Sequence, residues 1–301
     1  MIVNSLINKL KKRKLKNLII KPVFLKDSFY LNLIHFLENQ TYLNVKKIKL
    51  ILKNNFLLNM PIGYVMIDGF QNIVGFLGTI FSNRTVNESE FLQCCLHTWI
   101  VDKKYRLYSH NLLLQILEEY KDLNIFTFNP IYKLERLYLK FNFSNKIFYK
   151  EIFLFNFLNF FKKKNYQIIN EKEKYYDLLN NDHKKIFNDH SNLNPGLNFL
   201  FFKNINSSKF IFIITKKMFK KPLHYIEILY VSDFEEYAKH IDNINCEIFL
   251  KFKTFLIIYY NFSNFKSLSN SKIYFFKKKN TLFFKNFSKN HILDPLYSEF
   301  V

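Results

Sequence analysis

The sequence predicts an α+β protein with two tandem lobes, each a mixed, mostly antiparallel sheet flanked by helices. The 301 residues include 49% apolar and 19% aromatic side chains, enough to fill two hydrophobic cores of ordinary size. An order of strand-strand-strand-helix-strand recurs in both halves. We therefore expect a basic N-terminal helix over residues 1–16, a first lobe over 17–148 and a second α/β lobe over 149–301. The second lobe is either a diverged repeat of the first or an unrelated α+β domain.

The expected elements follow from hydrophobic period and from capping and turn residues. In the first lobe they are strand 17–25, helices 29–40 and 45–54, strands 62–68 and 73–82, polar loop 82–90, strand 92–101, helix 112–123, strand 124–128 and a helix closing on 138–143. In the second lobe they are polar helical stretch 165–195, strands 199–204, 209–217 and 223–231, helix 234–244, and strands 246–262 and 272–287. A capping box from Ser232 to Glu235 is expected to start helix 234–244.

Glycine is concentrated in one short part of the first lobe. Of the five glycines in the chain, Gly63, Gly69, Gly75 and Gly78 lie within the expected strand pair and its turn. A turn explains Gly69, because glycine adopts positive φ without strain. Inside a strand, Gly75 and Gly78 predict a bulge or a group pressed against the backbone.

The formal net charge of +21 would ordinarily suggest a nucleic acid or an anionic membrane as partner. However, only four of the 45 basic residues are arginine, in a chain crowded with Asn, Ile, Phe and Tyr. Surfaces that read phosphates and bases use arginine heavily. The lysine excess therefore favours a compositional bias over a nucleic-acid partner, although a basic nucleic-acid binder remains a rival hypothesis.

The cysteines and the hydrophobic runs exclude several classes of protein. Cys94, Cys95 and Cys246 form no even set for disulfides and have no metal-ligand spacing, so we expect no metal site and a reducing compartment. No apolar run approaches the length of about 18 residues that is typical of a membrane-spanning helix. The basic start of the chain does not resemble a secretory signal, and we expect a cytoplasmic protein.

The stretch over residues 92–143 predicts an anion site. An apolar strand over 92–101 ends at a turn over 102–111 that opens a helix and carries Arg106, one of only four arginines. The N-terminus of a helix presents free backbone N–H groups and the positive end of its dipole. This geometry suits a pyrophosphate.

Over residues 17–148 the sequence resembles the GNAT acyltransferase superfamily. The resemblance rests on the strand pair 62–68 and 73–82, the strand ending at Trp99, and the turn over 102–111. In that family the turn carries the pattern Arg/Gln-x-x-Gly-x-Gly/Ala, whose backbone amides hold the pyrophosphate of acyl-CoA. Arg106 matches its first position, whereas Ser109 and Asn111 replace the two small residues, which leaves less room for a phosphate. The string beginning at Trp99 is also similar to acyltransferase-like proteins of polysaccharide gene clusters.

The resemblance implies acetyl-CoA or another acyl-CoA as cosubstrate. It places these residues against the cosubstrate: Ile100, Val101, Arg106, Leu107, Tyr108, Ser109, His110 and Asn111. Tyr138 aligns with the tyrosine that protonates the departing thiolate, and the family ending Tyr-x-Lys-x-Gly-Phe is matched by Tyr138, Lys140 and Phe143, with Asn142 in place of glycine.

His97 has the right chemistry for the catalytic base. Since it lies two residues before Trp99 on the expected strand, we expect both side chains on one face of the sheet. Packing in the core is the alternative role for His97, and equally for Tyr138.

We therefore expect a cytoplasmic acyltransferase that moves an acyl group, in the first place acetyl, to an amine or hydroxyl. The acceptor would be a small or sugar-like molecule lying between the lobes. A non-catalytic GNAT-fold binding or scaffold protein is the rival, because fold alone does not determine function. The sequence defines neither the acceptor nor the oligomeric state.

Overall fold

The structure is a computed structural model of the chain. It describes residues 18–40, 43–53, 56–86, 89–155, 164–169, 175–191, 196–220, 222–261, 274–287 and 295–298. The helix predicted over 1–16 lies outside the described residues.

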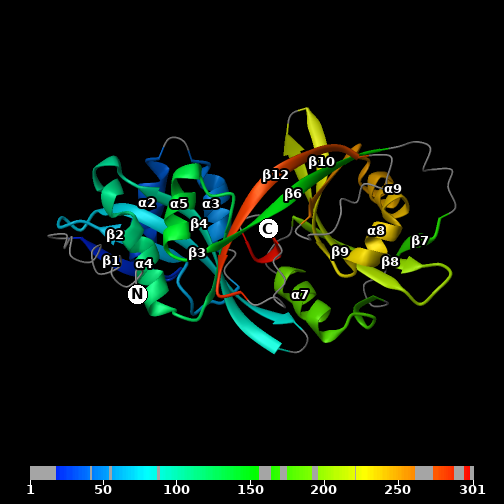
Figure 1. The fold of residues 1–301 in the computed structure, drawn as a ribbon, viewed down its shortest axis with the longest axis horizontal. Coiled ribbons are helices and arrows are strands. Elements are labelled where there is room, and N and C mark those ends of the chain that lie inside the picture. The colour runs from blue at the N-terminus through cyan, green and yellow to red at the C-terminus, as the bar shows by residue number, and fades with distance from the viewer. Residues whose placement is uncertain are drawn as a thin grey trace.

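Helices and strands are interspersed along both halves of the chain (Figure 1). The first half contains β1 (Ile19–Val23), α2 (Phe29–Glu38), α3 (Val45–Lys53), β2 (Gly63–Ile67), β3 (Ile73–Val86), β4 (Ser89–Val101), η1 (Lys103–Tyr108), α4 (His110–Glu119), β5 (Asn124–Phe128), α5 (Tyr132–Lys140) and β6 (Ser144–Leu154). The second half contains β7 (Tyr166–Ile169), α7 (Asn181–Ser191), β8 (Leu197–Asn204), β9 (Phe210–Lys220), β10 (Leu223–Val231), α8 (Phe234–Lys239), α9 (Ile241–Phe252), β11 (Leu256–Asn261), β12 (Tyr274–Lys285) and η3 (Pro295–Tyr297).

The described strands form one 12-stranded sheet in the order β1-β2-β3-β4-β5-β12-β6-β11-β10-β9-β8-β7. Two neighbouring pairs in this sheet are parallel, β4 with β5 and β10 with β11. The other pairs, such as β3 with β4 and β9 with β10, are antiparallel. The predicted fold class, α+β with mixed and mostly antiparallel sheets, is therefore confirmed.

The two halves exchange strands where they meet. β12 comes from the end of the chain, yet it lies between β5 and β6, with Leu282 paired to Phe128 on one side and to Lys146 on the other. β6 in turn pairs with β11 of the second half. The boundary predicted between residues 148 and 149 falls inside β6. The division into lobes at that point stays a prediction.

Helices cover both faces of the sheet in the first half, and the alternation of side chains along β2 explains why. Val65 and Ile67 belong to the core beneath α2 and α3. Tyr64 and Met66 point to the other face and belong to the core beneath α4 and α5. Each of these helices buries one apolar stripe, as expected for a helix that lies on a sheet.

Three predicted elements were wrong. The polar helical stretch expected over 165–195 begins with the strand β7, which pairs with β8. The strand expected over 246–262 is α9 up to Phe252, followed by β11. Ile241, Ile244 and Ile248 recur at helical spacing and are buried on one side of α9, so helical period prevails over a composition typical of strands. The polar loop expected over 82–90 is largely strand, since β3 runs to Val86 and β4 begins at Ser89.

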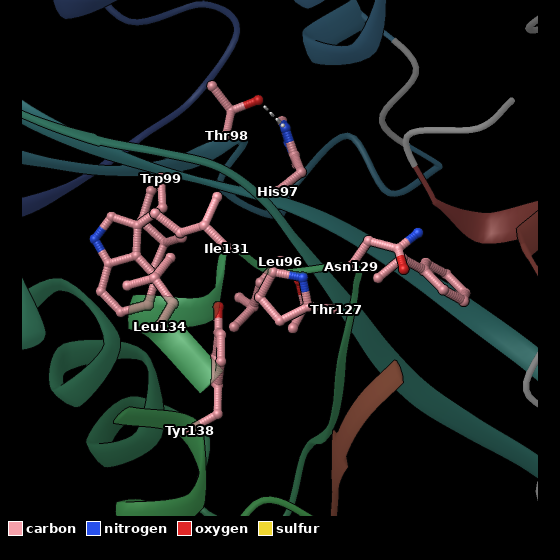
Figure 2. A pocket seen from close by; sticks show the side chains of 12 residues that line it. Leu96, His97, Thr98, Trp99, Thr127, Asn129, Ile131, Leu134 and Tyr138 are labelled. Carbon is pink, nitrogen blue, oxygen red and sulfur yellow. Dashed lines mark hydrogen bonds between the residues drawn. The ribbon is translucent and has the colours of Figure 1, made fainter. Parts of the chain in front are cut away.

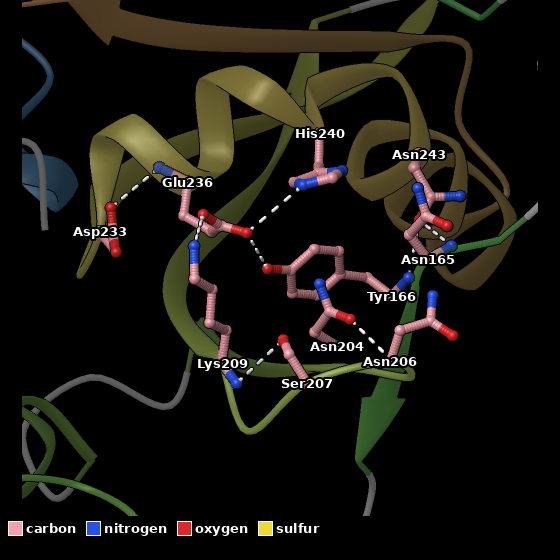
Figure 3. A network of polar contacts seen from close by, with 10 residues as sticks. All are labelled: Asn165, Tyr166, Asn204, Asn206, Ser207, Lys209, Asp233, Glu236, His240 and Asn243. Atoms are coloured by element: carbon pink, nitrogen blue, oxygen red, sulfur yellow. Dashed lines mark hydrogen bonds and ion pairs between the residues drawn. The ribbon is translucent and has the colours of Figure 1, made fainter.

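A polar network anchors the edge of the second half to α8 (Figure 3). The buried Glu236 carboxylate accepts hydrogen bonds from the Tyr166 hydroxyl at 2.7 Å and from the Lys209 ammonium at 2.6 Å. His240 Nε2 lies 3.3 Å from the same carboxylate. The hydrogen bond from Lys209, aided by that from Tyr166, lowers the pKa of Glu236 against the opposing effect of burial. The network therefore ties the β7 edge and the start of β9 to the helix.

Candidate active site

The cavity lies where two parallel strands diverge. The ladder between β4 and β5 covers only Gln93–Cys95 and Asn124–Phe126, and both strands continue beyond it. A cavity of about 170 Å³ occupies this gap. It is lined by residues 96–99 of β4, residues 127–131 of β5 and the following turn, and residues of α5 that include Tyr138 (Figure 2).

A bulge in β4 shapes one wall of this cavity. Trp99 pairs with Leu77 and His97 pairs with Gly78, so Thr98 is an extra residue on β4. Thr98 has φ +45°, and Asn129 on the opposite wall has φ +43°. Positive φ is a real outlier for a β-branched residue, and such strain clusters at functional sites.

The bulge also overturns the predicted orientation of His97. Leu77 and Gly78 are neighbours on β3 and so face opposite sides of the sheet, and their partners Trp99 and His97 do the same. Figure 2 shows His97 and Thr98 on one side of the β4 strand and Trp99 with Tyr138 on the other. The expectation that His97 and Trp99 share a face was therefore wrong, because the inserted residue shifts the period-2 alternation by one.

His97 is held closely and is electrically neutral. A Cβ added to Gly78 would lie 2.4 to 2.8 Å from three atoms of the imidazole, so the ring rests directly on the glycine backbone. Nδ1 lies 2.8 Å from the Thr98 hydroxyl, and the buried Nε2 has no hydrogen-bond partner among the described residues. Burial lowers the pKa of His97 to about 3, since the interior disfavours the imidazolium.

Tyr138 closes the cavity from the helical side. It is the buried residue of α5, with 2% of its surface exposed. Its ring packs edge-on against Trp99 at a centroid distance of 5.8 Å and lies 5.7 Å from Phe283 of β12. Thus the exchanged strand from the second half supports a residue that lines the cavity in the first.

The residues predicted to hold the cosubstrate lie on the segment that follows the cavity wall. Ile100 and Val101 are buried and pair with β3. Arg106 lies on η1, is exposed, and its Nε donates to the Val101 carbonyl at 3.4 Å. Ser109 has φ −56° and ψ −31°, so the turn passes without a left-handed residue into α4.

None of the eight predicted cosubstrate residues lines the cavity between β4 and β5. The structure therefore brings His97 and Tyr138 together but leaves the turn over 106–111 apart from them. Residues 102–105 of the same turn line a second hollow of about 390 Å³ together with Asp68 and Asn72. The assignment of pyrophosphate binding to the turn stays a prediction.

Sequence reasoning missed Thr98 and Asn129. Threonine carries no signal for positive φ, whereas the dipeptide Asn129-Pro130 is a turn signal that could have been used. Gly78 was singled out as a place where something presses on the backbone, and the His97 ring is that group.

Other site types find no support in the described residues. They contain no cluster of His, Cys, Asp and Glu side chains able to hold a metal ion. The three cysteines are buried and form no disulfide. Burial raises the pKa of the Cys94 thiol, which leaves it protonated and unreactive. Within the part of the chain that is described, no helix has both the length and the apolar composition needed to cross a bilayer.

Comparison with known proteins gives likeness in structure alone. No protein-family model and no curated protein sequence matches the chain. The GCN5-related N-acetyltransferase of Kribbella flavida superposes with a TM-score of 0.62 at 7% identity, over 89% of this chain and 70% of that one. The GCN5-related N-acetyltransferase of Anabaena variabilis gives 0.58 at 9% identity, over 89% and 72%. The N-myristoyltransferase of Saccharomyces cerevisiae gives 0.50 at 9% identity, over 91% and 81%.

These structures cover both halves of the chain, so the likeness extends beyond the residues 17–148 on which the sequence resemblance rests. At such low identities the likeness is one of fold. The chain therefore has the fold of the GCN5-related N-acetyltransferase (GNAT) superfamily.

Proposed function

We propose that the chain is an acyltransferase that moves an acyl group from acyl-CoA to an amine or hydroxyl of a small or sugar-like acceptor. One observation carries the proposal: the cavity between β4 and β5 brings together His97 and Tyr138 from opposite faces of the sheet. A proton acceptor and a proton donor on opposite sides of a thioester are what acyl transfer requires.

In this proposal the acceptor nitrogen or oxygen attacks the thioester carbonyl carbon, and its proton passes to Nε2 of His97. The carbon–sulfur bond then breaks, and the Tyr138 hydroxyl gives its proton to the departing thiolate. Return of a proton from His97 to Tyr138 through solvent restores both groups. The edge of β4 beyond Cys95 is not used by the ladder to β5, so its N–H groups can stabilise the oxyanion.

Acyl-CoA is the proposed cosubstrate, with acetyl-CoA as the first candidate. The turn over 106–111 directly follows the strand that lines the cavity and precedes the N-terminus of α4. A pyrophosphate held there and a thioester in the cavity would be joined by the pantetheine arm of one ligand. The sugar-like acceptor, the likeness to proteins of polysaccharide gene clusters and the cytoplasmic location stay predictions.

Calorimetric titration with acetyl-CoA tests the binding step. We expect a Kd between about 1 μM and 1 mM for the natural sequence. Arg106→Glu should abolish the heat because it removes the cation and adds a repelling charge at the turn. Arg136→Glu makes the same charge change at an exposed position of α5 and serves as the control. Absence of heat at millimolar acetyl-CoA, or an unchanged affinity in Arg106→Glu, would contradict the proposed site.

A non-catalytic binding protein of the same fold is the second candidate. The observation that favours it is the low pKa of His97, about 3, because an efficient general base has a pKa near the working pH. Incubation with acetyl-CoA and a panel of amine and hydroxyl acceptors, with release of free thiol as the readout, separates the two. Binding of acetyl-CoA without thiol release for any acceptor would favour the non-catalytic candidate.

A further inference from the structure

Thr98 occupies a backbone conformation that other residues adopt more easily. Its φ of +45° is unfavourable for a β-branched side chain. Among the described residues other than glycine, positive φ occurs also at Gln71, Asn129, Asn142, Lys253 and Asn286; none of these is β-branched, and asparagine tolerates this conformation well. The chain is rich in asparagine, yet it has threonine at this position. A requirement for the hydroxyl explains this choice.

The hydroxyl of Thr98 contacts His97, which is the proton acceptor in the proposed function. It lies 2.8 Å from Nδ1 of His97, within the distance of a good hydrogen bond. The ring of His97 also rests on Gly78, whose missing side chain leaves room for it. The imidazole is thus held at one edge and on one face. His97 lines the cavity, and its buried Nε2 has no hydrogen-bond partner among the described residues.

We propose that Thr98 is a positioning residue: its hydroxyl accepts a hydrogen bond from Nδ1–H of His97 and thereby leaves Nε2 unprotonated toward the acceptor. The inference rests on the proposed function. The hydrogen bond at one ring nitrogen determines which tautomer is present, so a neighbour at Nδ1 sets the chemistry at Nε2. The bulge is the device that brings the hydroxyl to the ring, because without the extra residue Thr98 would sit on the face opposite to His97.

Three variants at position 98 separate the hydroxyl from the backbone strain. Thr98→Ser keeps the hydroxyl, Thr98→Val keeps the shape but not the hydroxyl, and Thr98→Gly removes both the hydroxyl and the strain. We expect Thr98→Ser to keep kcat within a few fold. Thr98→Val and Thr98→Gly should lower kcat by about tenfold or more while the KM for acetyl-CoA stays unchanged. Thr98→Gly should unfold at the same temperature as the natural sequence or higher, since glycine adopts positive φ freely.

Nitrogen-15 NMR of histidine reports the tautomer of His97, which substitutions at position 98 would not change if Thr98 had only a structural role. In the natural sequence and in Thr98→Ser we expect an unprotonated Nε2 for His97, identified by the loss of its signals in His97→Gln. In Thr98→Val the tautomer should change or become mixed. A protonated Nε2 in the natural sequence, or unchanged kcat in both Thr98→Val and Thr98→Gly, would overturn the inference.

The NMR measurement also keeps the inference distinct from the proposed function. Failure of the natural sequence to bind acetyl-CoA would overturn the acyltransferase proposal. The tautomer of His97 in Thr98→Val would still show whether Thr98 positions the ring.

Discussion

At the scale of single residues, the site depends on two contacts of one imidazole. Gly78 provides the surface beneath His97, and Thr98 provides a hydroxyl at Nδ1. The identity of His97 and Tyr138 as candidates was accessible from the sequence through the family resemblance. The bulge could not be predicted from the sequence, because threonine is typical of regular strands and does not indicate a positive φ. As a result, the sequence predicted both residues as candidates but did not predict the face of the sheet on which each side chain lies.

The acid sensitivity of the fold should depend on His97. The pKa of His97 is about 3 in the folded chain and about 6.5 in an unfolded chain. Between these values His97 is protonated only in the unfolded chain. The free energy of unfolding should therefore decrease as the pH is lowered, by up to about 1.4 kcal/mol per pH unit. Urea unfolding at pH 7, 5 and 4 should show a shallower decline for His97→Gln. His224→Gln, which removes an exposed histidine, should behave as the natural sequence does. Parallel declines in His97→Gln and the natural sequence would show that His97 is accessible to protons.

Gly78→Ala should destabilise the chain by about 1–3 kcal/mol, because the new methyl group would overlap the imidazole of His97. Gly75→Ala is the matched control on the same strand, since its nearest neighbour, Val101 Cγ2, would lie at 3.1 Å and the overlap is therefore much milder. The clash should disappear in the double variant Gly78→Ala with His97→Ala, so the two changes should be non-additive. Additive changes in the free energy of unfolding would place the strain elsewhere.

At the scale of elements, periodicity predicted most strands and helices of both halves. It failed at α9 because Ile, Phe and Cys are also frequent in strands, so only their spacing reveals the helix. It also failed at the ends of β3 and β4, whose polar residues look like a loop but pair as a hairpin. Cross-strand pairing supplies hydrogen bonds that single-strand composition does not report.

The start of α8 shows how a cap can be misassigned by one residue. The predicted capping box began at Ser232, but the N-cap is Asp233, whose carboxylate accepts a hydrogen bond from the Glu236 N–H at 2.9 Å. Ser232 instead accepts a hydrogen bond from the backbone N–H of Phe212. Both residue types are good caps, so sequence alone does not separate them.

Asp233→Ala should lower the free energy of unfolding by about 0.5–2 kcal/mol through loss of this cap. Asp233→Asn keeps an acceptor oxygen and should retain most of the stability. Chemical unfolding monitored by far-ultraviolet circular dichroism measures both variants. Equal stability of Asp233→Ala and the natural sequence would show that α8 is held by packing and by the Glu236 network alone.

At the scale of the whole molecule, the exchange of β6 and β12 joins the halves into one sheet. Prediction of this arrangement from the sequence was out of reach, because the partners Leu282 and Phe128 are far apart along the chain and strand composition does not specify partners. The division of the chain at residue 148 followed from the repeat of element order. Pairing across that point links the two halves more closely than tandem lobes would suggest.

Phe283→Ala should therefore affect both stability and the cavity in the other half of the chain. Phe283 is 1% exposed and packs on Tyr138, so its truncation should cost about 3–5 kcal/mol. Phe70→Ala makes the same truncation at a side chain that is 86% exposed and serves as the control. If the proposed function holds, Phe283→Ala should also reduce kcat at temperatures where the protein remains folded, because Tyr138 loses its support. Thermal unfolding and thiol release measure the two effects, and normal kcat would separate β12 from the chemistry.

The insertion of β12 beside β5 has a consequence for synthesis. During translation, residues 92–143 leave the ribosome long before residues 274–285 do, and domains begin to fold as they emerge. β5 must wait for its neighbour β12, with one edge unpaired, until residues 274–285 have been made. A chain that has been made only as far as residue 273 therefore lacks Phe283 behind Tyr138, and the cavity is complete only after β12 has been made.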